Sequence, residues 1–152
     1  MQTDVRTSPP ERSDPPERGD LWVLVARIEW GLRPPGTLAA HQQPWLSQLL
    51  ESLETMLKRR FEDEEAASPL YREVPVHAPA LVSHVEALRR EHAMLLGWLH
   101  RLVEVGRLAP DPVLLATLTG EVRDLLRALR RHEHAEEDTL DDAVLADLPA
   151  TD

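Results

Sequence analysis

The chain has 152 residues, enough for one domain with a substantial apolar core, and its formal net charge is −10 at pH 7. This charge argues against nucleic acid or an anionic membrane as a partner, because both would repel an acidic surface. The sequence contains no cysteine, which excludes disulfides, zinc fingers, cysteine-ligated iron–sulfur clusters and thiol catalysis.

The distribution of prolines and leucines predicts one helical domain between two tails. Residues 1–18 hold four prolines and little apolar surface, so we expect a disordered tail there. Leucine is abundant and no segment alternates apolar with polar residues, which predicts an all-α domain over residues 19–146 and a short tail over 147–152. The longest apolar run, residues 21–26, is too short to cross a bilayer, and the chain opens without the apolar core of a signal peptide. We therefore expect a cytoplasmic protein.

Four segments carry apolar residues at helical spacing. We expect a first helix over 20–33 with Asp20 as its cap, and three more over 44–65, 79–105 and from Pro112 onward, the last capped by Asp111. The segment 37–43, which contains His41, is ambiguous, and 66–78 is expected to be a connection. Four helices with mostly short connections predict an antiparallel up-down-up-down four-helix bundle.

Polar residues interrupt three of these apolar stripes. In the third helix the stripe runs from Leu88 through His92, and in the fourth it continues into His132 and Glu136, four residues apart on one face. The register of the second helix places Arg60 and Glu64 on its inner face. Spacing alone is weak evidence, since three histidines in the chain are followed by an acid four residues later. Only the His132–Glu136 pair coincides with a buried stripe.

These inward residues have the chemistry of a metal site. In an antiparallel bundle the end of the second helix, the middle of the third and the late part of the fourth can meet at one level. Neutral imidazoles and carboxylates are the ligands expected for iron, manganese or zinc. The alternative for each histidine is a core residue with a satisfied hydrogen bond. The remaining acids near the two helix ends are expected to face solvent: Glu62, Asp63, Glu65, Glu133, Glu137, Asp138, Asp141 and Asp142.

The sequence resembles the hemerythrin-like (HHE) cation-binding domains at three motifs, over roughly residues 20–145. The motifs are Phe61-Glu-Asp-Glu-Glu65, Leu88-Arg-Arg-Glu-His92 and His132-Glu-His-Ala-Glu-Glu137, in the family's order. The resemblance implies a nonhaem di-iron centre and a role in oxygen or nitric oxide binding, iron or redox sensing, or storage, mostly without enzymatic turnover. It also implies four metal ligands, namely Glu64, His92, His132 and Glu136.

Two departures from the family pattern leave three states open. Arg60 stands where the family has a histidine on the second helix, and residues 20–33 contain no histidine. One metal could be held by the four remaining ligands, or two metals could be completed by His41 and water. In the third state no metal binds, Arg60 neutralises the carboxylates, and the bundle serves partner binding or regulation.

An enzyme is the least favoured interpretation. Ferritin-type oxidase sites use Glu-x-x-His, and no histidine in the chain has a glutamate three residues before it. The serines show no nucleophile elbow or triad setting, so we expect no hydrolytic activity.

Overall fold

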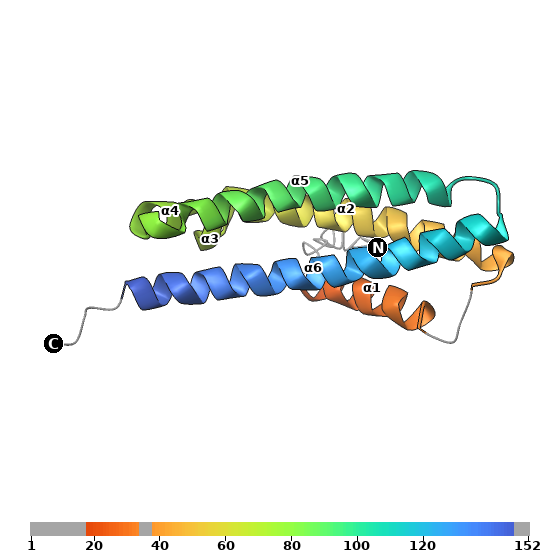
Figure 1. The fold of residues 1–152 in the computed structure, drawn as a ribbon, viewed down its shortest axis with the longest axis horizontal. Coiled ribbons are helices and arrows are strands. Elements are labelled where there is room, and N and C mark those ends of the chain that lie inside the picture. Colours follow the sequence, from red (N-terminus) through yellow and green to blue (C-terminus); the bar gives the residue numbers. More distant parts are fainter. Residues whose placement is uncertain (1–17, 34–37, 148–152) are drawn as a thin grey trace, which may run out of the picture.

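A computed structural model describes residues 18–33 and 38–147, and most of these residues are helical, with no strand among them (Figure 1). The prediction of an all-α protein is confirmed. The predicted terminal tails fall almost entirely on residues 1–17 and 148–152, outside the described residues. Four long helices carry the fold: α1 (Arg18–Gly31), α2 (Gln43–Ala67), α5 (Val82–Gly106) and α6 (Pro112–Ala146). Four single turns connect them: η1 (Ala40–Gln42), α3 (Pro69–Arg72), α4 (Val74–His77) and η2 (Pro79–Leu81).

Helix α5 packs against both α2 and α6, and in Figure 1 it runs opposite to both of them. Helix α1 packs on α2 and α6 but has only 14 residues, against 35 in α6. At a rise of about 1.5 Å per residue, α1 therefore covers less than half the length of α6. The short turns α3 and α4 lie at the end of the bundle that α1 does not reach (Figure 1).

The apolar side chains form two clusters with a polar layer between them. The main cluster joins α1, α2, α5 and α6, and the smaller one joins α3, α4 and the beginning of α5. Along α5, His92 lies between Leu88 of the smaller cluster and Leu95 of the main one. The predicted stripes therefore face inward as expected, and the polar residues that interrupt them lie at the boundary between two apolar regions.

Local interactions explain where several helices begin and end. The Asp111 carboxylate accepts hydrogen bonds from the backbone N–H groups of Val113 and Leu114, both at 2.9 Å, so the predicted cap of α6 is confirmed. Helix α1 begins at Arg18 rather than after Asp20, which lies in its first turn. Its other end is held by α6, because Arg123 Nε donates to the Leu32 carbonyl oxygen at 2.8 Å.

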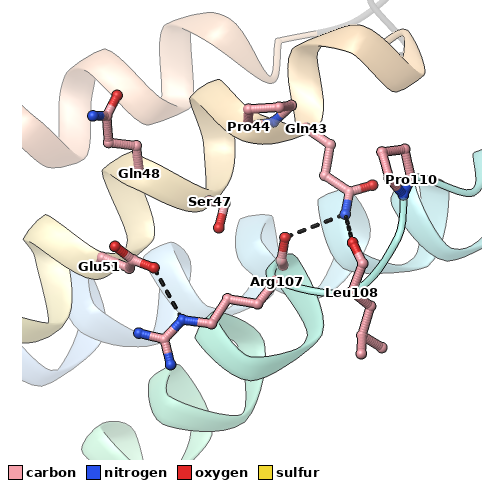
Figure 2. Close-up of a pocket in the computed structure, with 9 residues that line it drawn as sticks. Gln43, Pro44, Ser47, Gln48, Glu51, Arg107, Leu108 and Pro110 are labelled. Atoms are coloured by element: carbon pink, nitrogen blue, oxygen red, sulfur yellow. Dashed lines mark hydrogen bonds and ion pairs between the residues drawn. The ribbon is translucent and has the colours of Figure 1, made fainter.

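Figure 2 shows the end of the bundle opposite α3 and α4, where α2 meets the turn between α5 and α6. The side-chain amide nitrogen of Gln43 donates to the carbonyl oxygens of Gly106, at 3.2 Å, and Leu108, at 2.9 Å. Arg107 Nε pairs with Glu51 at 3.0 Å. These contacts fix the register of α2 against α5, and hence the level at which their polar residues meet. Each helix in the described ranges is too short or too polar to cross a lipid bilayer.

Candidate metal centre

Two imidazoles converge on one carboxylate between α5 and α6. His92 Nε2 lies 3.2 Å and His132 Nε2 lies 3.1 Å from the same oxygen of Glu136. All three residues are buried, and their ligand atoms lie within 4.8 Å of one another. The spacing of four residues in α6 gives His132 and Glu136 a common face, and α5 supplies the second imidazole.

Glu64 adds a second carboxylate from α2. Its Oε2 atom lies 3.7 Å from His92 Nε2 and is buried without a hydrogen-bond partner. Its other oxygen accepts a hydrogen bond from Arg60 Nε at 2.7 Å. The structure thus brings together all four predicted ligands, although their role as ligands stays a prediction.

Arg60 places a fixed positive charge on the α2 side of this cluster. Besides Glu64, its guanidinium binds Glu133 of α6, with Nη2 and the carboxylate oxygen 2.6 Å apart. Its Nη1 is buried without a partner, and the guanidinium lies 5.5 Å from the centre of the Trp22 ring in α1. Where the resemblance implies a histidine on α2, the structure therefore has an arginine that also lies over a tryptophan of α1.

Carboxylates also lie behind both imidazoles. His92 Nδ1 is 2.7 Å from an oxygen of Glu65, and His132 Nδ1 is 3.2 Å from an oxygen of Glu91. The tautomer with its proton on His92 Nδ1 donates to Glu65 and leaves Nε2 available to a cation, whereas His132 Nδ1 approaches Glu91 without hydrogen-bond geometry. The Phe61 ring stacks on His92 with 3.8 Å between ring centres and keeps that imidazole in place.

Two acids predicted to face solvent take part in these contacts, so the prediction is wrong for Glu65 and Glu133. Their side chains are only 34% and 28% exposed. Both lie on the flank of their helix, from where a glutamate is long enough to reach an inward partner. The other acids in that set are exposed as expected: Glu62, Asp63, Glu137, Asp138, Asp141 and Asp142.

Tyr71, in the single turn α3, is a residue of the site that no sequence pattern predicted. Its hydroxyl donates to Glu136 Oε1 at 2.5 Å and lies 3.0 Å from His92 Nε2. A four-residue helix carries no periodicity that could reveal its buried face. The available signal was composition, because this is the only tyrosine in the chain and it follows Glu64 and Glu65 closely.

The surroundings shift the pKa values of these groups in different directions. Burial alone would lower the pKa of His132, but hydrogen bonds and charge from Glu136 and Glu91 outweigh it and raise that pKa. Burial would raise the pKa of Glu136, yet its bonds with His132, His92 and Tyr71 hold that pKa well below its ordinary value. Burial and the charge of Glu136 raise the pKa of Glu64, despite Arg60. Two carboxylates that repel each other in a buried space favour a bound cation.

The other described histidines lie away from this cluster. His41 is exposed in η1, and along α2 the distance to the level of Glu64 is roughly 30 Å at 1.5 Å per residue. It therefore cannot complete the site in the way that the two-metal state requires. The remaining four are also exposed: His77, His84, His100 and His134.

The chemistry of the donor set suits a metal cation. It offers two imidazole nitrogens and two carboxylates, a mixture suited to iron, manganese or zinc. The unpartnered Oε2 of Glu64 is an acceptor that a cation would satisfy. A second cation would meet the positive charge of Arg60, and among the described residues no further imidazole lies near it.

Comparison with protein-family models gives one match. The model described as the hemerythrin HHE cation-binding domain matches residues 35–143, more than two thirds of the chain, and this range includes all four predicted ligands. The comparisons with curated proteins and with solved structures gave no match.

Proposed function

Because the chain belongs to the hemerythrin HHE cation-binding domain family, we propose that His92, His132, Glu136 and Glu64 bind a single metal cation. The observation that carries this proposal is the convergence of the two Nε2 atoms on one Glu136 oxygen, at 3.2 and 3.1 Å, in a buried space. The donor set and the family together favour nonhaem iron. When bound, iron would supply a redox-active centre that responds to oxygen or nitric oxide.

The protein's own part in this function is to hold the ligands before the cation arrives. Glu65 orients the imidazole of His92 through Nδ1, Phe61 packs on the same ring, and Glu91 places a negative charge 3.2 Å from His132 Nδ1. Such partners raise the basicity of the ligand nitrogen and restrict its rotation. The cation therefore enters a site whose ligand atoms need little rearrangement.

Arg60 is the reason for proposing one cation rather than the two that the resemblance implies. Its guanidinium is bound between Glu64 and Glu133 at 2.7 and 2.6 Å. A permanently charged side chain at this position repels a second cation and occupies the carboxylate that would help to hold it.

We further propose that the domain, residues 19–146 in up-down-up-down order, binds or senses small ligands rather than turning over an organic substrate. A cavity of about 80 Å³ adjoins the site and is lined by Arg60, Glu64, Tyr71 and Glu136, among others. Since about 10–15 Å³ of such volume holds one water molecule, this space has room for a few waters or a diatomic gas beside the proposed ligands.

One observation favours a second candidate, a metal-free bundle that serves partner binding or regulation. The pairing of Arg60 with Glu64 and Glu133 already supplies positive charge to the carboxylates. In that case the family fold is retained and Arg60 takes over the electrostatic role of the metal.

Equilibrium metal titration separates the two candidates. The apo protein is titrated with Fe²⁺ without oxygen, and in parallel with Zn²⁺, and bound metal is measured after gel filtration. We expect one cation per chain, loss of binding in His132→Ala, and unchanged binding in His134→Ala, whose side chain is 76% exposed. Absence of metal from the wild type would reject cation binding and favour the metal-free bundle. Two cations per chain would reject the role given to Arg60.

A further inference from the structure

Tyr71 lies among the ligand atoms of the proposed site, and the proposed function gives it no role. The ring is buried, and its hydroxyl oxygen is 2.5 Å from Glu136 Oε1 and 3.0 Å from His92 Nε2. These are the same two atoms through which Glu136 and His92 face each other. The hydroxyl therefore occupies the space in which a cation would meet its ligands.

We propose that the Tyr71 oxygen is a further ligand of the bound cation and makes the centre selective for ferric iron. This inference rests on the proposed function, because it requires that His92, His132 and Glu136 bind a metal. The added ligand comes from α3, the single turn that follows α2 in the sequence.

Cation binding would change the hydrogen-bond partners of the Tyr71 hydroxyl. A cation bound to His92 Nε2 takes one of these partners and competes with the hydroxyl for the other, Glu136 Oε1. A buried hydroxyl left without a partner is unfavourable. The cation would lie within reach of this oxygen, so the position of the side chain favours coordination.

The charges of the ligands favour a trivalent cation. Binding as a phenolate adds a third negative ligand to Glu64 and Glu136, and three negative ligands with two neutral imidazoles balance a trivalent cation. Arg60 shares its charge between Glu64, at 2.7 Å, and Glu133, at 2.6 Å, and Glu133 supplies a further negative charge beside it. A phenolate oxygen is also a hard donor, which favours a hard cation such as ferric iron over softer divalent metals.

The proton balance is simple, because coordination breaks the phenolic O–H bond and forms a metal–oxygen bond. Without a cation, the Tyr71 phenol keeps its proton and donates it in the hydrogen bond to Glu136. A bound cation reverses this preference and releases one proton. The proton can leave through the cavity that Tyr71 lines together with Ser68 and Glu137.

The connection between α2 and α5 explains how Tyr71 reaches this position. Ser68 leaves the helical conformation, with φ −68° and ψ 136°, and Pro69 starts the new turn α3. The turn buries both Leu70 and Tyr71. Leu70 packs in the smaller apolar cluster and anchors the turn, so the phenol is held against the polar layer rather than exposed.

Optical spectroscopy of the ferric protein tests this proposal. The full chain is loaded with Fe³⁺ from its nitrilotriacetate complex, freed of excess metal, and measured by visible absorption and resonance Raman scattering. We expect a visible phenolate-to-iron charge-transfer band and enhanced tyrosinate ring vibrations. Because the chain has a single tyrosine, no other residue can give this band. The Zn²⁺ form serves as the control and should have no visible band.

The variant Tyr71→Phe removes only the hydroxyl. We expect it to lose the band and to bind Fe³⁺ at least about 100-fold more weakly, while its Zn²⁺ affinity falls less. Affinity alone is a weaker test, because loss of a partner that merely orients a ligand also costs about 10- to 100-fold. The spectrum of the wild type tests whether Tyr71 is a ligand even if Tyr71→Phe fails to fold.

Several outcomes would overturn the proposal. If the wild type binds one Fe³⁺ without the band, Tyr71 is not a ligand and the proposed cation site still stands. If the wild type binds no metal, both proposals fail together. A band that persists in Tyr71→Phe would show that the absorption has another origin.

Discussion

Replacing Arg60 with methionine should destabilise the apo protein and, at the same time, strengthen metal binding. Methionine keeps an unbranched side chain but removes the guanidinium that pairs with Glu64 and Glu133 at 2.7 and 2.6 Å. Glu64 is then left as a buried carboxylate beside Glu136, without its positive partner. A metal cation, in contrast, would no longer compete with Arg60 for the Glu64 carboxylate.

The magnitude follows from the burial of the pair. Breaking a buried ion pair costs about 3–5 kcal/mol. Glu133 is 28% exposed and can be solvated, and Glu64 can take up a proton because its pKa is already raised, so we expect roughly 2–4 kcal/mol. For a domain of this size the loss lowers the melting temperature by roughly 10 °C. The loss of stability should be smaller at pH 5 than at pH 8, because a protonated Glu64 is neutral and needs no positive partner.

Urea unfolding and metal titration measure the two effects. Arg59→Met is the matched control, because Arg59 is 57% exposed on the same helix and should change stability by less than about 0.5 kcal/mol. The metal affinity of Arg60→Met should rise by at least about tenfold, equivalent to about 1.4 kcal/mol. If Arg60→Met is as stable as Arg59→Met, or binds metal more weakly than the wild type, the electrostatic role given to Arg60 is wrong.

Three further predictions concern proton binding, the orienting carboxylates and the far end of the bundle. Folding raises the pKa of His132, so this side chain stabilises the apo protein below about pH 6.5, and the stabilisation is lost as pH rises through the folded pKa. Urea unfolding at pH 6 and pH 8 should show this loss of stability. In His132→Gln the loss should be absent. Glu65→Gln should weaken metal binding by about 10- to 100-fold in titration calorimetry. The exposed Glu62→Gln is the control, and equal metal affinities in the two variants would contradict the role of Glu65 in orienting His92. Gln43→Ala removes two hydrogen bonds to backbone carbonyls and should cost about 1–3 kcal/mol in urea unfolding with unchanged metal affinity.

The residues that periodicity could predict are those on the inner faces of long helices. His92 and Leu88 lie on one face of α5, and His132 and Glu136 on one face of α6, so their burial followed from spacing alone. Extending the apolar register of α2 likewise placed Arg60 inward. These positions depend only on helix geometry, which the sequence pattern determines over many turns.

The parts of the site that the sequence did not predict come from side-chain reach and from short structure. Glu65, Glu91 and Glu133 contact the imidazoles or Arg60 from flank positions, because a glutamate side chain can extend around its helix. Tyr71 depends on a four-residue turn whose direction is set by Ser68 and Pro69 rather than by periodicity. Both effects require the packed arrangement of several helices to be known.

Anomalous diffraction from crystals of the iron-loaded protein tests the central claim most directly. Data collected on either side of the iron absorption edge locate bound iron without reference to the protein ligands. One peak per chain, in contact with His92 Nε2, His132 Nε2 and Glu136, is the result we predict. No peak at this position in crystals that contain stoichiometric iron, or two peaks beside Arg60, would contradict the assignment of a single-cation centre.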